Sequence, residues 1–397
     1  MLCRSLFFFL FCFELACPQT LKMNPKIIVV GCGIVGALIA YELSARTHAD
    51  ICVLDKQQPA QGSTGAALGV LMGIINHKVK GRTWRLREAS VRRYRSLISE
   101  LDQQGYTVPF NSQGIASLCF EEKKLLKWQT LKEKRHAQGW PLEIWSPAEL
   151  KARCPHIALE STTESGVSRS VKAAIHSPAD AQVHPSALTR ALVAAAEARG
   201  VSFCWDTEVT QLNTKGKRCV NVQINQANLK REIDADWVIL SAGLGSAQLT
   251  QTVSQPLELM PVLGQAMEIQ MPEVLGDRTF QPVINGDDIQ FVPLGDGRYW
   301  LGATVEFPTG NIPLRAEAKG LENLQKGAAQ FCPAIGEAKI IRTWRGLRPR
   351  PVGQPAPVIQ PLGELQNVTL ATGHYRNGVL LAPSTAQQVC ELLADAL

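Results

Sequence analysis

The feature that most constrains this chain is a strand–turn–helix–strand pattern within residues 27–55. Residues 27–30 form a short apolar run rich in β-branched side chains, which is typical of a strand buried on both faces. Gly31, Gly33 and Gly36 follow with G-x-G-x-x-G spacing, and the residues after them are apolar with helical periodicity. A second apolar run at 51–54 ends in Asp55. The pattern predicts a Rossmann-like dinucleotide-binding unit.

Each part of this unit has a physical role. Gly31 permits the tight turn, Gly33 lets the backbone approach a pyrophosphate, and Gly36 brings the helix against the strand. The helix N-terminus supplies N–H donors, and Asp55 stands where a carboxylate can accept hydrogen bonds from a ribose. The unit alone does not separate a nicotinamide coenzyme from FAD. The predicted cofactor contacts in this part of the chain are Gly31, Gly33, Ile34, Val35, Gly36, Asp55 and Lys56.

The composition is that of a globular protein, and the length of the chain suffices for about two or three domains. The 397 residues are 45% hydrophobic and 19% charged. The net charge of +6 is compatible with an anionic cofactor or substrate, and by itself does not indicate nucleic acid. The 11 cysteines are scattered without a C-x-x-C pair, so we expect buried free thiols, no metal site and no disulfide framework.

The first 22 residues have two interpretations. The apolar run at 6–13 behind Arg4 is too short to span a bilayer and is typical of a signal-peptide core, with a cleavage region near Cys17. Glu14 weakens that interpretation. We favour translation starting at Met23, because residues 23–26 supply the short lead-in that a dinucleotide-binding strand usually has. We therefore expect a cytoplasmic protein without stable membrane insertion.

Two further segments have the small residues that let a backbone approach a flat ligand. The first is the run at 61–71, which places Ser63, Thr64 and Gly65 among the expected cofactor contacts. The second follows a buried strand at 236–241 and begins with Ala242 and Gly243. Successive strands are expected at 201–209 and 219–224, and we add Val209 to the cofactor contacts.

The remaining expected elements include two helices and an antiparallel sheet. Residues 82–101 predict an amphipathic helix whose arginines, Arg87 among them, we place on a solvated face. Between residues 261 and 304, short segments in which apolar and polar residues alternate are separated by turns, which predicts an antiparallel sheet. A last helix is expected at 384–397. No repeat or low-complexity linker occurs, so we expect interleaved domains.

Taken together, these features resemble the flavin-dependent D-amino-acid oxidase family, most closely its glycine oxidase branch. The resemblance rests on the glycine fingerprint, the loop at 62–69, the hairpin segment 296–304 and two C-terminal motifs. Those motifs are Gly-Leu-Arg-Pro at 346–349 and Gly-His-Tyr-Arg-Asn-Gly-Val-Leu-Leu-Ala-Pro at 373–383. The resemblance implies an α/β fold in which a Rossmann-like FAD-binding domain of the glutathione-reductase type is interleaved with an antiparallel-sheet substrate domain. The expected segments are 23–105, 173–250 and 344–397 for the FAD domain, and 106–172 and 251–343 for the substrate domain.

The resemblance also implies roles for individual residues. Arg348 would grip a substrate carboxylate through two parallel hydrogen bonds, the alternative being a surface salt bridge. Arg376 would be a second polar group at the edge of the active site. His374 is either a base or a packing residue. Backbone along the flavin ring is expected at Gly373, Asn377, Gly378, Val379 and Leu380.

The implied reaction is oxidation of a C–N bond in glycine or another small amino acid or amine. Hydride would pass from Cα to flavin N5, and the imine would hydrolyse to an oxo acid and ammonia, with oxygen reduced to hydrogen peroxide. A quinone acceptor, a larger amino acid, a nicotinamide-dependent dehydrogenase and a non-catalytic flavoprotein are the alternatives. Family members often have a tyrosine just before the Val-Pro of the hairpin, whereas residues 289–293 here are Ile-Gln-Phe-Val-Pro. No nucleic-acid partner is expected, and assembly into a homo-oligomer is left open.

Overall fold

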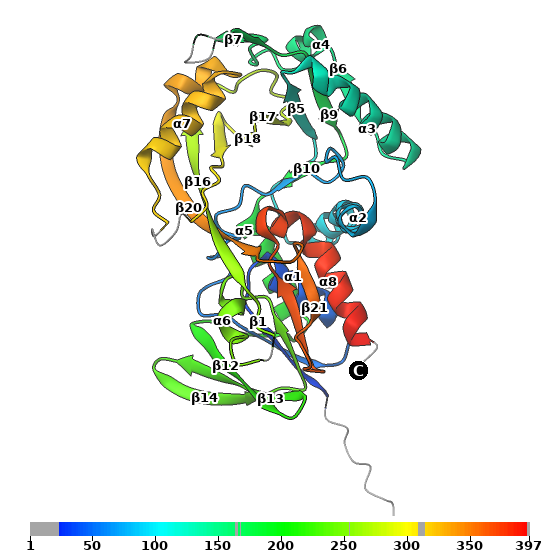
Figure 1. The fold of residues 1–397 in the computed structure, drawn as a ribbon, viewed down its shortest axis with the longest axis vertical. Helices are drawn as coiled ribbons and strands as arrows, with labels where there is room; N and C mark the ends of the chain where they lie inside the picture. Colours follow the sequence, from blue (N-terminus) through cyan, green and yellow to red (C-terminus); the bar gives the residue numbers. More distant parts are fainter. Residues whose placement is uncertain (1–23, 163–165, 167, 254, 309–313, 395–397) are drawn as a thin grey trace, which may run out of the picture.

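The fold consists of two large sheets built from interleaved segments of the chain (Figure 1). The structure is a computed structural model that describes residues 24–162, 166, 168–253, 255–308 and 314–394. The two interpretations of residues 1–22 therefore concern a segment outside the described residues. In Figure 1 the first sheet lies in the lower half and the second in the upper half, and the long strands β16 and β20 lead from one toward the other.

The lower sheet has the predicted parallel core. Its six strands among the described residues are ordered β11-β2-β1-β15-β22-β21, and only β21 runs antiparallel to its neighbour. β1 lies between β2 and β15, so all its side chains after Lys26 are buried. The strands are β1 (Lys26–Val30), β2 (Asp50–Leu54), β11 (Ser202–Cys204), β15 (Trp237–Leu240), β21 (Val358–Pro361) and β22 (Val368–Thr372).

Helices cover one face of this sheet. α1 is buried from Ile34 to Leu43 because it packs against α5 and α8 as well as the sheet. A single apolar cluster joins these helices to α2 and to one face of β1 and β2. Their bounds are α1 (Ile34–Ser44), α2 (Gly81–Gln103), α5 (Pro185–Glu197) and α8 (Gly378–Ala394). The opposite face is covered by a three-stranded sheet of β12 (Thr207–Lys215), β13 (Arg218–Gln226) and β14 (Leu229–Asp234).

The upper sheet is mostly antiparallel, as the alternating segments predict. Its described strands are ordered β20-β16-β19-β18-β17-β5-β9-β6, with one parallel pair, β17 and β5. α7 (Ala318–Ala329) packs on β16, β18 and β19, and α3 (Leu125–Ala137) and α4 (Pro147–Arg153) lie near β6. The strands are β5 (Ile115–Cys119), β6 (Glu143–Trp145), β9 (Ala173–Ser177), β16 (Leu259–Gln270), β17 (Val283–Gly286), β18 (Ile289–Gly295), β19 (Arg298–Gly302) and β20 (Lys339–Pro351).

Shorter elements complete the described chain. A three-stranded sheet is formed by β3 (Val70–Leu71), β10 (Ala181–Val183) and β4 (Phe110–Asn111), and β7 (Glu160–Thr162) pairs with β8 (Ser168–Ser170). α6 (Gly245–Leu249) follows β15. Single 3₁₀ turns occur at η1 (Glu122–Lys124), η2 (Pro333–Glu337) and η3 (Tyr375–Asn377).

Two expectations differ from the structure in their boundaries. The last helix, expected from residue 384, begins at Gly378, so Gly378, Val379 and Leu380, expected as backbone along the flavin, already lie in the first turn of α8. β9 and all of β20 belong to the upper sheet, although the expected segment boundaries after 172 and 343 would assign β9 and the second half of β20 to the FAD domain. The division into segments remains our proposal.

Candidate functional site

The glycine turn is fixed by close packing on all sides. Gly31 has a φ of +97°, and a Cβ on it would lie 2.7 Å from Ala242 Cα. A Cβ on Gly36 would lie 1.9 Å from the Gly31 carbonyl oxygen. Because neither contact is possible for a real side chain, these two positions require glycine. The predicted tight turn and the predicted helix–strand contact are therefore both present.

Polar groups around the turn hold the start of α1. The Cys32 amide donates to Asp55 Oδ2 at 2.6 Å, and the Ile34 amide donates to Thr64 Oγ1 at 3.0 Å. Burial raises the pKa of Asp55, and hydrogen bonds from the Cys32 and Gln57 amides oppose that rise. The first amides of a helix have no intrahelical acceptor, and because those of Cys32 and Ile34 are taken by Asp55 and Thr64, the Gly33 amide between them remains available to an anion.

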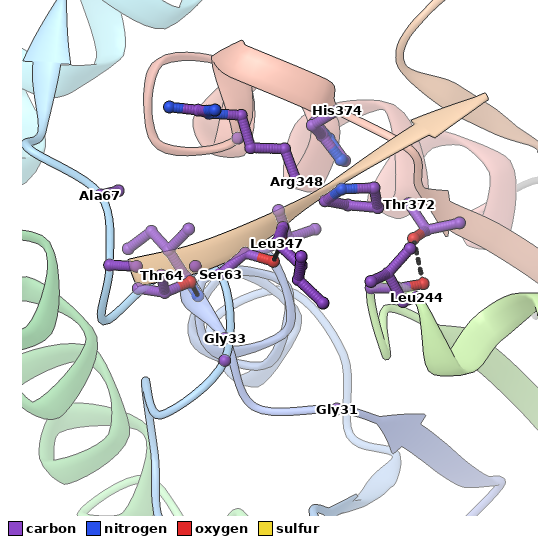
Figure 2. A pocket seen from close by; sticks show the side chains of 18 of the residues that line it. Gly31, Gly33, Ser63, Thr64, Ala67, Leu244, Leu347, Arg348, Thr372 and His374 are labelled. Atoms are coloured by element: carbon purple, nitrogen blue, oxygen red, sulfur yellow. Dashed lines mark hydrogen bonds between the residues drawn. The ribbon is translucent and has the colours of Figure 1, made fainter. Parts of the chain in front are cut away.

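A cavity of about 910 Å³ opens from this turn and extends to the upper sheet. Its volume is within the range of sites for cofactors and small ligands. Figure 2 shows Gly31, Gly33 and Thr64 on one side of the cavity and Arg348 and His374 on the other. The predicted site residues that line it are Gly31, Gly33, Ile34, Val35, Asp55, Lys56, Ser63, Thr64, Val209, Ala242, Gly243, Arg348, Arg376, Asn377, Gly378, Val379 and Leu380.

Three predicted cofactor residues do not lie on the cavity wall. Gly36 packs against the turn, as described above. A Cβ on Gly65 would lie 2.3 Å from the Ala60 carbonyl oxygen, and one on Gly373 would lie 2.8 Å from Pro351 Cγ. These glycines allow close contacts behind the wall and so shape the cavity from outside it.

The small-residue loop at 62–69 packs directly on β20. Ser63 Oγ donates to the Leu347 carbonyl at 2.6 Å, and Trp344 Nε1 donates to the Ala66 carbonyl at 3.1 Å. A Cβ on Gly346 would lie 2.3 Å from Ala66 Cβ. The loop and the strand that carries Arg348 therefore form one continuous wall between the two sheets.

Arg348 is half-buried and held by backbone. Its Nη1 donates to the carbonyls of Leu263 at 3.0 Å and Thr304 at 3.1 Å. The guanidinium lies over Gly264 on the neighbouring strand, in the space where a side chain of that residue would be. Among the described residues no carboxylate forms an ion pair with Arg348, which favours the carboxylate-binding interpretation over the alternative of a surface salt bridge.

A second cation stands near Arg348. Burial lowers the pKa of Arg348, and the charge of Arg376 lowers it further, against the opposing effects of Tyr375 and Glu306. Two neighbouring arginines facing one cavity repel each other, so an anion bound between them is favoured. This arrangement suits a carboxylate ligand.

His374 is a buried, neutral histidine. Its side chain is 4% exposed, and its Nε2 lies 2.8 Å from Thr385 Oγ1. Burial, reinforced by Arg82, lowers the pKa of His374 to about 3. A histidine with that pKa and a hydrogen-bonded Nε2 favours the packing interpretation over the catalytic base.

Arg87 was placed on a solvated helix face by the sequence analysis, and that placement is wrong. Its side chain is 6% exposed and lines the cavity. Nη1 donates to the Met72 carbonyl at 2.5 Å, and Nη2 donates to Asn377 Oδ1 at 2.9 Å. Burial lowers the pKa of Arg87, and the carboxylate of Asp180 opposes that effect. Arg87 therefore ties α2 to the segment that carries Arg376.

Two other lining residues were not among the predicted site residues. Gln290, in the hairpin segment where the family's tyrosine is absent, lines the cavity, and its Nε2 donates to Asn285 Oδ1 at 2.8 Å. Gly264 lines it below Arg348. Within the described ranges no group of three or more His, Cys, Asp or Glu side chains could hold a metal ion, and no helix there is long and apolar enough to cross a membrane.

The residues present fit FAD. The turn at 31–33 is kept free of side chains, the helix start presents amides, and small residues at 62–69 and 242–243 leave the cavity open toward the upper sheet. These are the features that a long dinucleotide with a flat ring requires.

Fold and site together define a flavin-dependent oxidoreductase. The family model DAO, described as FAD dependent oxidoreductase, matches residues 26–392. The chain therefore belongs to this family and uses FAD, which confirms the resemblance found in the sequence.

Particular relatives are similar along most of the chain. The glycine oxidase of Geobacillus kaustophilus is 27% identical over 377 residues, which cover 92% of each protein. The bifunctional protein ThiO/ThiG of Trichormus variabilis is 29% identical over 378 residues, which cover 94% of this chain and 53% of the relative. The chain thus spans about half the length of that bifunctional relative.

Solved structures share the fold. The crystal structure of glycine oxidase from Geobacillus kaustophilus superposes with a TM-score of 0.80 at 24% identity, over 94% of this chain and 95% of that one. The L-α-glycerophosphate oxidase of Mycoplasma pneumoniae with FAD bound gives a TM-score of 0.75 at 18% identity, over 94% and 95% of the two chains. The predicted fold class is confirmed.

Proposed function

We propose that this protein oxidises the C–N bond of an amino acid, with glycine or another small amine as the first candidates. The observation that carries the proposal is Arg348, a half-buried guanidinium in the FAD cavity that is held by carbonyls and has no carboxylate partner among the described residues. A planar guanidinium binds a carboxylate through two parallel hydrogen bonds and so fixes the orientation of the adjacent carbon.

FAD supplies the acceptor for the hydride that leaves the substrate carbon. The residues of the chain bind the substrate and orient it. Arg348 holds the substrate carboxylate, and Arg376 adds positive charge at the same end of the cavity. The wall of loop 62–69 and β20, joined by hydrogen bonds from Ser63 and Trp344, borders the cavity beside Arg348. No protein base is required if the amine binds deprotonated, because proximity and alignment then carry the reaction.

The proposal is supported by the similarity to glycine oxidases and by the positive charge at the substrate end of the cavity. The product would be an imine that hydrolyses to an oxo acid and ammonia. We propose oxygen as the electron acceptor, with formation of hydrogen peroxide, and a quinone as the alternative. The proposal leaves open whether the protein assembles into a homo-oligomer.

Anaerobic reduction of the bound FAD tests the proposal. Glycine, sarcosine, proline and D-amino acids are each added to the purified holoenzyme, and bleaching of the flavin absorbance is recorded. We expect at least one to bleach it, and we expect Arg348→Ala to keep FAD while its KM rises by about thirtyfold or more, because a charged partner is worth about 2–4 kcal/mol. Reoxidation with oxygen or with a quinone then identifies the acceptor. Absence of bleaching by every amine would reject the proposal.

A further inference from the structure

Tyr375 is an aromatic residue in a backbone conformation that favours glycine. It lies between His374 and Arg376 in the turn η3, with a φ of +54°. A positive φ is uncommon outside glycine, and it is an outlier for a bulky side chain. Such conformations persist only where the surrounding structure fixes them, and they are frequent at functional sites. The outlier here coincides with a residue that lines the cavity.

The Tyr375 hydroxyl has no partner. The residue is half-buried, and its side-chain oxygen forms no hydrogen bond within the described ranges. That oxygen is not one of the fully enclosed polar atoms that lack a partner, so a ligand in the cavity can reach it. Tyrosine hydroxyls in partly buried positions usually have a hydrogen-bond partner. A bound ligand can therefore supply the missing one.

Arg350 fixes the Tyr375 ring from the side of β20. Its Cζ lies 5.7 Å from the centroid of the Tyr375 ring and 5.2 Å from that of Phe307, so the guanidinium contacts two aromatic rings. Arg348 projects from the same face of β20 as Arg350, because the two residues are two positions apart and no bulge interrupts the strand there. The Tyr375 ring thus lies on the face of the strand that carries Arg348.

Electrostatics agree with this placement. Burial and the charge of Arg376 lower the pKa of Arg348, whereas Tyr375 raises it. An oxygen acts on a guanidinium in this way only when it lies near it, because the interaction weakens with distance. The phenol oxygen is therefore close to the end of the cavity where the guanidinium is held.

We propose that the Tyr375 hydroxyl donates a hydrogen bond to the substrate carboxylate that Arg348 holds. This inference rests on the proposed function, because it takes Arg348 as the carboxylate site. The two oxygens of a carboxylate offer about four acceptor positions, so one carboxylate can bind the guanidinium and the phenol together. A hydroxyl that donates to an ionised oxygen forms a strong hydrogen bond, and it adds no further cation beside Arg348 and Arg376.

Binding of acetate to the holoenzyme tests the inference. The Kd is measured from the change in the visible spectrum of bound FAD, for the wild-type protein and for Tyr375→Phe. We expect the Kd to rise about tenfold, the lower end for a hydrogen bond to a charged group. FAD content and Tm should be unchanged, because phenylalanine keeps the ring that Arg350 contacts.

A matched control and a double-mutant cycle assign the effect. Tyr106 is also half-buried, and it lies outside the cavity, so Tyr106→Phe should bind acetate as the wild-type protein does. Once Arg348→Ala is present, the carboxylate is no longer held beside the phenol, and Tyr375→Phe should add little. An unchanged acetate Kd in Tyr375→Phe would overturn the inference, and so would effects of Tyr375→Phe and Arg348→Ala that add fully.

Anaerobic flavin reduction separates this inference from the proposed function. With an amine that bleaches the wild-type flavin, we expect Tyr375→Phe to raise the KM about tenfold and to change the rate at saturation much less. If amines reduce FAD while Tyr375→Phe binds acetate as the wild-type protein does, the inference fails and the proposed function stands. If Tyr375→Phe weakens acetate binding but no amine reduces FAD, the proposed function fails and the carboxylate contact of Tyr375 stands.

Discussion

Adding one methyl group at Gly264 should disable Arg348 without changing Arg348 itself. A Cβ at that position would lie 2.3 Å from Nη2, 2.4 Å from Nη1 and 2.5 Å from Cζ of Arg348. Ordinary contact begins near 3.4 Å, so the guanidinium must move by about 1 Å, which takes its bonds to the Leu263 and Thr304 carbonyls out of hydrogen-bond range. Gly264→Ala should therefore weaken carboxylate binding.

The size of the effect follows from the interaction that is lost. A hydrogen bond to a charged group is worth about 1.5–3 kcal/mol, so the Kd for a carboxylate should rise about tenfold to a hundredfold. The assay is a titration of the holoenzyme with acetate, followed by the visible spectrum of bound FAD. Gly336→Ala is the matched control, because its Cβ would meet its nearest neighbour at 3.8 Å and the residue lies outside the cavity.

A double-mutant cycle shows whether the effect passes through Arg348. Once Arg348→Ala is present, the extra methyl group has nothing to displace, so Gly264→Ala should add little to it. Acetate binding that is unchanged in Gly264→Ala would refute the placement of the guanidinium. Fully additive effects in the double variant would refute the proposal that Gly264→Ala acts by displacing Arg348.

Three further changes test other parts of the structure. Gly36→Ala should abolish FAD retention and lower the Tm, because its Cβ would lie 1.9 Å from the Gly31 carbonyl oxygen; a yellow protein of normal Tm would contradict this. Arg87→Met should raise the Kd for FAD by about tenfold or more, since the Asn377 side chain loses its charged donor, and fluorescence of released FAD measures it; an unchanged Kd would remove Arg87 from the site. His374 has a pKa lowered to about 3, so the folded protein binds fewer protons there than the unfolded chain between about pH 3 and 6.5, and the free energy of unfolding should fall as pH falls through that window. Urea unfolding at pH 7 and pH 5 should show a smaller loss in His374→Gln, and equal losses would contradict the assignment.

The local parts of the site were predictable from the sequence. The glycine turn and Asp55 follow from spacing along a short segment, and the steric reason for Gly31 and Gly36 is local backbone contact. The family resemblance supplied Arg348, which the structure places in the cavity. The fold class, the family and the cofactor are confirmed, whereas the roles of the individual site residues remain predictions.

Arg87 was missed because its charge was taken as evidence of solvation. Helical spacing contains the opposite signal: Trp84, Val91 and Tyr94 are buried on α2, and Arg87 lies on the same stripe. A buried arginine whose two terminal nitrogens donate to a carbonyl and a side-chain amide is compatible with that stripe, although charged residues are seldom buried.

The early start of α8 at Gly378 was not predictable from one sequence. Packing against α1 and α2 stabilises a helical turn ahead of Pro383, and spacing along the chain does not encode contacts between distant helices.

The most direct measurement is a crystal structure of the protein with FAD and a carboxylate ligand. The account predicts the diphosphate beside the glycine turn, at the Gly33 amide and the start of α1, and the carboxylate on the Arg348 guanidinium, beside the flavin ring. FAD absent from that turn, or an Arg348 side chain directed into bulk solvent away from the ring, would contradict it.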